Sequence, residues 1–427
     1  MKLADLTGKN VCILGFGREG KVSLQMLELF APQARITIAD QNHVKAGDYP
    51  VISGADYLTK LSEFDVIIKT PGIAWEPPAE LYRKITNATQ IFLDSLPRAV
   101  QVIGVTGTKG KSSTATLIHH LLKESGRSTF LAGNIGEPML SLLPEVKDGD
   151  IVVLELSSYQ LSNLTTSPEI AVITSFFPDH TDYHGSVAAY FDAKSNIARY
   201  QTARDTIFFN ADFSECRQLA ELSPGLKVSF SGNDLSADLK NIAAPGAVPS
   251  NMAAAVLVSR HLGLSEAEIV KGVLSAPKLA HRQQLIGEYA GVNWVEDSAA
   301  TTPQSTQEAL WALGDTVDTL IVGGLNRDYD FTTLGQQIAT SKITNVVLFP
   351  DTGRMIRKQI EAASANKPKY YFETSSIDEA VAWAAKHTAA GKTCLLSSGA
   401  PSYNLFQNFG ERGDAFQKAV VALDSAN

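Results

Sequence analysis

Short apolar runs alternate with helix-length amphipathic stretches along almost the whole chain, and this alternation limits the possible folds more than any other feature. Helical patterns include Val22–Phe30, which Pro32 stops, and a stretch around Leu117–Leu122, which Gly126 caps. Parallel strands need such crossovers, so an α/β fold with parallel sheets is predicted. The expected strands are Val11–Leu14, Ile36–Ala39, Val66–Ile68, Val102–Val105, Ile151–Leu156, Ile170–Thr174, Thr206–Phe209, Asn293–Val295, Thr319–Val322, Asn345–Phe349 and Thr393–Leu396.

The chain has 427 residues, more than one hydrophobic core usually supports, so several domains are expected. Proline and short polar breaks interrupt the pattern near Leu96 and near Pro277–Leu279. We therefore predict an N-terminal domain over residues 1–95, a central domain over 96–278 and a C-terminal domain over 279–427.

Composition and charge exclude several classes of function. No apolar run reaches the roughly 18 residues needed to cross a bilayer. A net charge of −8 argues against a nucleic-acid-binding surface. Cys12, Cys216 and Cys394 lie far apart, which predicts neither a disulfide framework nor a zinc site. The N-terminus lacks the pattern of a signal peptide, so a cytoplasmic protein is expected.

The strongest local motif is the segment Gly104–Ser113, which lies between an expected strand and an expected helix. Backbone N–H groups in such a loop converge on phosphate oxygens. Lys111 can neutralise the β- and γ-phosphates, and the Ser112 hydroxyl can ligate Mg²⁺. Val105 occupies the position of the usual first glycine, so Gly107 is expected to supply the flexibility. The alternative is a structural glycine-rich turn, but Gly-Lys-Ser at this junction favours ATP or GTP.

A second glycine cluster, Gly15–Gly20, follows the first strand, and Asp40 stands at the end of the next strand. This spacing fits a dinucleotide fingerprint with Asp40 on a ribose hydroxyl. Two alternatives are a structural tight turn and a UDP-sugar held by the same diphosphate geometry. A separate nucleotide loop is already present, which disfavours NAD.

Several further segments occur together in one order along the chain: Thr106–Ser112, Gly133–Gly136, Leu154–Leu161, Pro178–Asp182, Tyr190–Lys194, His281–Arg282, Glu296–Ser298 and Asn408–Gly413. This ordered series resembles the Mur ligases, most closely the branch that adds glutamate to UDP-N-acetylmuramoyl-L-alanine. The resemblance covers essentially the whole chain. Folylpolyglutamate synthases share part of the series. A catalytically inactive nucleotide switch and a dehydrogenase are weaker alternatives.

The resemblance implies three domains: Rossmann-like N- and C-terminal domains around a central P-loop ATPase domain. It also implies a ligase of cell-wall peptidoglycan synthesis that makes an acyl phosphate from ATP and a carboxylate, which an amino acid then attacks. Lys111, His180 and Lys194 would be catalytic. Two Mg²⁺ ions are expected, with Ser112, Glu155, His180 and a carbamylated Lys194 as ligands. Only small-molecule partners are expected, without membrane insertion, and the protein is expected to be a monomer.

The resemblance also implies roles for residues around this centre. ATP would contact the loop residues Thr106, Gly107, Thr108, Lys109, Gly110, Lys111, Ser112 and Ser113, together with Asn251, Arg282 and Asp297. The UDP-muramoyl substrate would contact Gly15, Phe16, Gly17, Arg18, Asp40, Thr70, Pro71, Gly72, Asn134, Ser157 and Gln160. Glutamate would contact Thr301, Arg327, Ser402 and Phe409.

Three departures from the family pattern concern the adenine and amino-acid sites. Ala247-Val248 stand where His-Asn is usual. Ala299 replaces a common lysine, and Thr302 replaces an asparagine. Arg327 stands where another lysine is typical, and its planar fork could grip a carboxylate bidentately. A variant branch with a similar pattern adds L-glutamate, so the enantiomer stays open, with D-glutamate as the first expectation.

Overall fold

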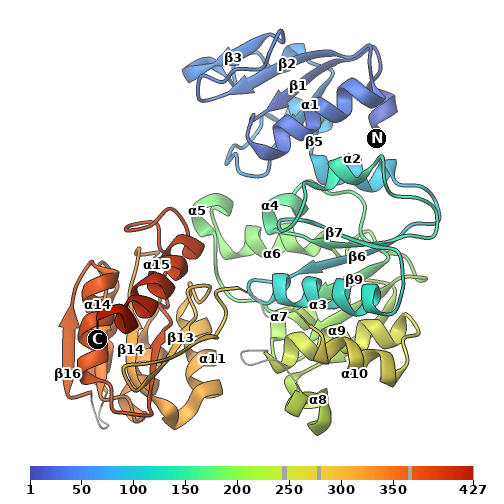
Figure 1. Ribbon diagram of the computed structural model, residues 1–427. Helices are drawn as coiled ribbons and strands as arrows, with labels where there is room; N and C mark the ends of the chain where they lie inside the picture. Colours follow the sequence, from blue (N-terminus) through green and yellow to red (C-terminus); the bar gives the residue numbers. More distant parts are fainter. Residues whose placement is uncertain (243–247, 277–279, 328, 364–367, 427) are drawn as a thin grey trace. The chain divides into compact units, whose positions relative to one another are not determined.

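The computed structural model describes residues 1–242, 248–276, 280–327, 329–363 and 368–426 (Figure 1). The described residues form two compact units, one before residue 277 and one from residue 280 onward. The first unit contains two sheets and the second contains one. The expected α/β fold class is confirmed. The domain boundaries stay predictions, and the one expected between residues 278 and 279 lies outside the described residues.

The N-terminal sheet has the strand order β3-β2-β1-β4-β5, and all its neighbouring strands are parallel. Its expected strands are confirmed, whereas β3 and β5 are too short to stand out as apolar runs. Helix α1 begins directly after the first glycine cluster, and α2 leads toward the central sheet. The bounds are β1 Asn10–Leu14, α1 Arg18–Phe30, β2 Arg35–Asp40, β3 Val51–Ser53, β4 Val66–Lys69, β5 Ile85–Thr86 and α2 Ala88–Ser95.

The central sheet is also parallel throughout, with the order β11-β10-β9-β6-β8-β7. Its strands are β6 Gln101–Thr106, β7 Thr129–Gly133, β8 Ile151–Glu155, β9 Ile170–Ile173, β10 Thr206–Asn210 and β11 Leu226–Phe230. Its helices are α3 Lys111–Glu124, α4 Ser158–Leu161, α5 Thr181–His184, α6 Val187–Ser195, α7 Ser214–Glu221, α8 Ala237–Ile242, α9 Pro249–His261 and α10 Glu266–Leu274.

Apolar side chains from α3, α9 and α10 cover one face of the central sheet (Figure 1). Ile118 and Leu121 on α3 pack with Val256 and Ile269 there, all fully buried. Gly126 ends α3 as predicted: its φ is +81°, and its N–H donates to the carbonyl of Lys123 at 3.0 Å. A buried face on each side explains why these strands are apolar throughout rather than alternating.

The C-terminal sheet has the order β12-β13-β17-β14-β15-β16, and its first strand corrects the expectation of purely parallel sheets. Strand β12 pairs antiparallel with β13 through the two-residue turn Ala290-Gly291, where both residues have positive φ. The bounds are β12 Gln284–Tyr289, β13 Val292–Glu296, α11 Pro303–Leu313, β14 Val317–Val322, α12 Thr332–Thr340, β15 Asn345–Leu348, α13 Gly353–Ala362, β16 Tyr370–Glu373, α14 Ile377–His387, β17 Thr393–Leu396 and α15 Phe409–Val421.

The carboxyl ends of the parallel strands carry most of the chemistry-bearing residues. In the central sheet, β6 ends at Thr106 and β8 ends at Glu155. Open α/β sheets bind ligands at this edge. Within the part of the chain that the structure describes, every helix is too short or too polar to span a bilayer.

Candidate active site

The phosphate loop joins β6 to α3, and two of its glycines are required by close packing. Gly107 has a φ of +150°, and a Cβ there would lie 2.1 Å from the Thr174 hydroxyl. Gly110 has a φ of +88°, and a Cβ there would lie 2.3 Å from the side-chain oxygen of Asn251. Gly107 therefore adopts a backbone conformation that favours glycine, and Asn251 packs directly against the loop.

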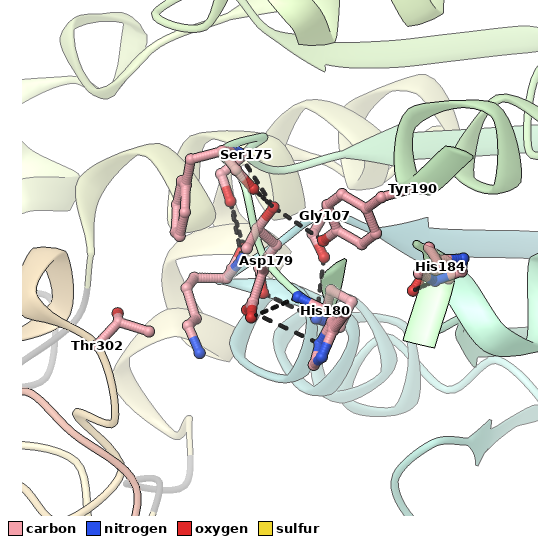
Figure 2. A network of polar contacts seen from close by, with 12 residues as sticks. Gly107, Ser175, Asp179, His180, His184, Tyr190 and Thr302 are labelled. Atoms are coloured by element: carbon pink, nitrogen blue, oxygen red, sulfur yellow. Dashed lines mark hydrogen bonds and ion pairs between the residues drawn. The ribbon is translucent and has the colours of Figure 1, made fainter. Parts of the chain in front are cut away.

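Ser175, which the sequence reading missed, holds the same loop from the segment just after β9 (Figure 2). Its carbonyl accepts from the N–H of Thr108 at 2.9 Å, and its hydroxyl accepts from the N–H of Lys109 at 2.9 Å. The Thr174 hydroxyl donates to the carbonyl of Lys109 at 2.6 Å. The loop is thus held from the strand beside it, which preorganises its shape for phosphate.

Lys111 begins α3 and folds back over its own loop. Its Nζ donates to the carbonyls of Gly107 at 2.9 Å and Thr108 at 3.1 Å. Burial lowers the pKa of Lys111, while the carboxylates of Glu155 and Asp179 act in the opposite direction. A bound phosphate group would bring negative charge next to the Lys111 side chain and so favour its charged ammonium form. The neighbouring Ser112 is exposed.

Glu155 has the features of a cation ligand. It ends β8 with 1% of its surface exposed. Its Oε1 accepts from the Asn134 side chain at 3.0 Å, whereas its buried Oε2 has no hydrogen-bond partner. An unpartnered buried carboxylate oxygen is costly unless a cation or donor reaches it. Among the described residues, no group of three or more His, Cys, Asp or Glu side chains could hold a metal ion by itself.

Lys194 lies on α6 and is 1% exposed. Its Nζ donates to the carbonyl of Gly107 at 3.0 Å and lies 4.8 Å from the centre of the Tyr190 ring. The Tyr190 hydroxyl lies 3.0 Å from the Thr108 hydroxyl, which ties α6 to the phosphate loop (Figure 2). Burial lowers the pKa of Lys194 well below its usual value, and Lys111 lowers it further. Both effects favour the neutral, nucleophilic form of the amine.

His180 precedes α5 in a left-handed conformation with a φ of +52°. Its Nε2 lies 3.8 Å from a carboxylate oxygen of Asp179, a residue the sequence reading gave no role. Partial burial lowers the pKa of His180, whereas the carboxylate of Asp179 raises it. The positive charges of Lys111, Lys194 and Lys109 lower it further. The charges at Lys111, Glu155, His180 and Lys194 therefore influence one another, as expected for residues of a single site.

The first glycine cluster packs against the loop after β4. A Cβ on Gly15 would lie 2.1 Å from the Thr70 hydroxyl, which donates to the Leu14 carbonyl at 3.1 Å. The two carboxylate oxygens of Asp40 accept from the N–H groups of Phe16 at 2.7 Å and Asn42 at 2.8 Å. Asp40 therefore shapes this loop, and its contact with a ribose stays a prediction.

Gln160 is 2% exposed and has its side-chain amide engaged inside the protein. Its Oε1 accepts from the N–H and the hydroxyl of Ser157 at 3.0 and 3.1 Å. Its Nε2 donates to Glu19 on α1 at 3.2 Å, while the guanidinium of Arg18 donates to the carbonyl of Gly136 at 2.7 Å. The sequence reading missed Glu19, because a single carboxylate on a helix carries no motif.

The second unit gathers its predicted residues beyond the carboxyl ends of three adjacent strands. Asp297 and Thr301 follow β13, Arg327 follows β14, and Ser402 follows β17. Arg327 and Phe409 are exposed, and Ser402 is buried. Of the two residues in place of the usual His-Asn, Ala247 lies outside the described residues and Val248 caps α9.

Asp297 is 1% exposed, and both of its carboxylate oxygens are used within the protein. Oδ1 accepts from the N–H of Gln283 at 3.2 Å, and Oδ2 accepts from the Ser397 hydroxyl at 2.8 Å. Burial raises the pKa of Asp297 to about 7 against the opposing effect of Arg282. A role in binding the ribose stays a prediction.

An Asp297→Asn substitution is expected to stabilise the protein at pH 8 and to lose this effect toward pH 5. The folded-state pKa of about 7 lies above the usual 3.8, so the folded state binds more protons between these values. The free energy of unfolding therefore falls as pH rises through that window. The Ser397 hydroxyl can turn to Thr306, 3.0 Å away, and accept from the new amide.

Urea unfolding at pH 5 and pH 8 measures this difference, which is at most about 3 kcal/mol. The exposed Asp48→Asn variant is the control. Equal stabilisation at both pH values would show that desolvation of the Asp297 charge is not the cause.

Comparison with known proteins adds independent findings. Two family models match: the Mur ligase middle domain over residues 105–249, and the Mur ligase, glutamate ligase domain, over residues 281–400. The chain is 32% identical to the UDP-N-acetylmuramoylalanine--D-glutamate ligase of Acetivibrio thermocellus, with 98% of each chain covered. It is also 32% identical to the UDP-N-acetylmuramoyl-L-alanine--L-glutamate ligase of Salinispora tropica, over 98% of this chain and 99% of that one.

A solved structure shares the fold. The MurF ligase from Thermotoga maritima in complex with ADP aligns with a TM-score of 0.62 at 16% identity, over 100% of this chain and 97% of that chain.

Proposed function

Because the chain belongs to the Mur ligase family, we propose that it uses ATP to join glutamate to UDP-N-acetylmuramoyl-L-alanine in peptidoglycan synthesis. D-Glutamate is the proposed amino acid. The observation that carries the proposal is the grouping of the phosphate loop with the buried carboxylate of Glu155 and the buried amine of Lys194. This grouping suits phosphoryl transfer to a carboxylate.

A free carboxylate resists attack by an amine, because its negative charge repels the nucleophile and oxide is a poor leaving group. Transfer of the γ-phosphoryl group of ATP to a carboxylate oxygen releases ADP and gives an acyl phosphate. The glutamate amine then attacks the acyl carbon, loses a proton, and expels inorganic phosphate. Lys111 would hold the phosphates in line with the carboxylate and offset the charge that gathers between them.

The residues at the edge of the central sheet fit a magnesium ion. Hard oxygen ligands suit Mg²⁺, which keeps several waters and binds phosphate oxygens as well. Glu155 offers the unpartnered Oε2, and the exposed Ser112 offers a hydroxyl at the start of α3. His180 would serve a second ion. Bound Mg²⁺ would supply charge neutralisation for the phosphoryl group.

Lys194 is proposed to carry a carbamate. A neutral amine adds to CO₂ and loses a proton, which converts the lysine into a carboxylate-like anion. Burial and the nearby Lys111 both favour the neutral amine that this reaction requires. The resulting anion would offset the positive charge of Lys111 and provide a further oxygen ligand for a metal ion.

L-Glutamate is the second candidate amino acid, and two observations favour it. Ala299 and Thr302 replace the lysine and asparagine usual in the family, and the variant branch that adds L-glutamate has a similar pattern. The relative from Salinispora tropica, named for L-glutamate, is as similar in sequence as the one named for D-glutamate.

Phosphate release tests the proposal. Purified protein with MgATP and UDP-N-acetylmuramoyl-L-alanine receives D-glutamate, L-glutamate, meso-diaminopimelate or no amino acid in parallel. The expected result is phosphate release with D-glutamate, together with the ligated product by mass spectrometry. Release with L-glutamate alone would establish the second candidate. Absence of release from folded protein in every arm would overturn the proposed activity, and an arm with a folate acceptor tests the polyglutamate alternative.

Arg327→Ala is expected to raise the KM for glutamate by about tenfold to a hundredfold while kcat changes little. The exposed guanidinium lies beyond β14, where it could bind the side-chain carboxylate of glutamate through two hydrogen bonds. Steady-state kinetics at varied glutamate measures the effect. Arg354→Ala, which removes an exposed arginine of the same unit, is the control. An unchanged KM for glutamate would remove Arg327 from the binding site.

A further inference from the structure

The turn that carries His180 is too short to hold its own position. Helix α5 comprises only Thr181–His184, and left-handed residues flank it, with φ of +52° at His180 and +77° at Gly185. The N–H groups of Tyr183 and His184 both donate to the His180 carbonyl. A single helical turn is unstable without tertiary contacts. The position of His180 therefore depends on what anchors Tyr183 and His184.

Tyr183 anchors the turn through its hydroxyl group. The hydroxyl proton is shared between the carbonyls of Pro71 at 2.8 Å and Ile73 at 3.1 Å, and the oxygen accepts from Lys69 Nζ at 3.0 Å. Burial raises the pKa of Tyr183 to about 12, which keeps the hydroxyl protonated as a donor. Its ring packs on Tyr159, with ring centres 4.3 Å apart.

Lys69 completes this contact from the end of β4. It is 7% exposed, and burial lowers its pKa to about 8. Its ammonium lies 5.6 Å from the centre of the Tyr183 ring. The next residues along the chain are Thr70, Pro71 and Gly72, the loop proposed to bind the UDP part of the acceptor. The buried ammonium of Lys69 therefore donates to a tyrosine of helix α5.

The second anchor is helix α4, which follows strand β8 of the central sheet. His184 Nε2 lies 3.0 Å from the hydroxyl of Ser158, which follows Ser157, a residue expected to contact the UDP-muramoyl substrate. His184 also stacks on Tyr159, with ring centres 5.5 Å apart and an interplanar angle of 11°. The turn thus contacts α4 through His184 and the Tyr183 ring, and it contacts the loop after β4 through the Tyr183 hydroxyl.

We propose that Tyr183, held by Lys69, is a positioning residue that couples the acceptor-binding loop to His180. Movement of the loop when the UDP substrate binds is transmitted, through the hydrogen bonds from Tyr183 to the Pro71 and Ile73 carbonyls, to the turn that begins at His180. This inference rests on the proposed function, because it concerns the same ligation reaction.

Tyr183→Phe tests the inference, because it removes the hydroxyl and keeps the ring that packs on Tyr159. We expect kcat to fall about tenfold and the KM for the UDP acceptor to rise, while the KM for ATP stays within about twofold. Tyr49→Phe is the matched control, since it removes a tyrosine hydroxyl that bonds to Glu28 at 2.8 Å, away from this contact. Kinetics of Tyr183→Phe equal to those of the control, in an active wild type, would overturn the coupling.

Lys69→Met gives a second, independent measurement. Methionine keeps the length and apolar stem of lysine but cannot donate to Tyr183. We expect a smaller loss of kcat than in Tyr183→Phe, and a double variant no worse than Tyr183→Phe alone, because both substitutions break one linked contact. Fully multiplicative losses would show that the two residues act separately. An inactive wild type would instead count against the proposed function.

Discussion

Replacing Lys111 with alanine is expected to lower kcat for ligation by about a hundredfold to a thousandfold. Lys111 begins α3, and its ammonium already rests on the carbonyls of Gly107 and Thr108 inside the phosphate loop. A γ-phosphoryl group in transfer spreads charge over its oxygens, and a preorganised cation stabilises that charge most at the transition state. The loss should therefore fall on kcat more than on the KM for ATP.

The matched control is Lys123→Ala, which removes an exposed lysine from the far end of the same helix. Phosphate release and product formation are measured for both variants, with thermal unfolding to confirm folding. The loop is held by Ser175 and Thr174 independently of the lysine side chain, so the Lys111 variant should fold. Turnover within a few-fold of wild type would exclude Lys111 from transition-state stabilisation.

Runs of apolar residues predicted the central strands well, because strands buried inside a parallel sheet are apolar along their whole length. Strands such as Ile151–Glu155 are buried on both faces, so they read as continuous apolar runs. Gly126 at the end of α3 was predictable for a similar reason, since a left-handed position favours glycine. Strands β7, β11 and β16 were not predicted, because most of their side chains are only partly buried or exposed. The antiparallel strand β12 was not predicted either. Its turn contains Ala290 rather than the usual Asn or Asp, and its burial alternates only weakly.

The residues of the candidate site could be predicted only where several of them are neighbours in the sequence. The phosphate loop is such a case, because its glycines, Lys111 and Ser112 form one segment. Contacts between single residues far apart in sequence carry no comparable signal. Glu19 and Gln160 are separated by 141 positions, and Lys69 and Tyr183 by 114. These pairs become visible only once β4, α1 and the central helices are placed in space.

Replacing Lys194 with methionine is expected to lower kcat by at least about a hundredfold. The free energy of unfolding is expected to stay the same or to increase. The amine is buried, and its pKa is lowered well below the usual value, which means that the folded state disfavours its charge. Unfolded lysine titrates at about 10.4. Between the two pKa values the unfolded state binds more protons, so the Lys194 contribution to stability rises with pH. Methionine removes this dependence.

Carbon dioxide supplies the sharper measurement for Lys194. Wild type in CO₂-depleted buffer should lose activity and regain it with bicarbonate, whereas Lys194→Met should stay inactive in both. With ¹³C-labelled bicarbonate, a carbamate carbon signal is expected in wild type and not in the variant. Lys194→Met removes one donor from the Gly107 carbonyl, but that carbonyl still accepts from Lys111 at 2.9 Å. Loss of activity with unchanged stability would therefore place the effect on chemistry, whereas a large fall in unfolding temperature would mean that Lys194 mainly supports the loop.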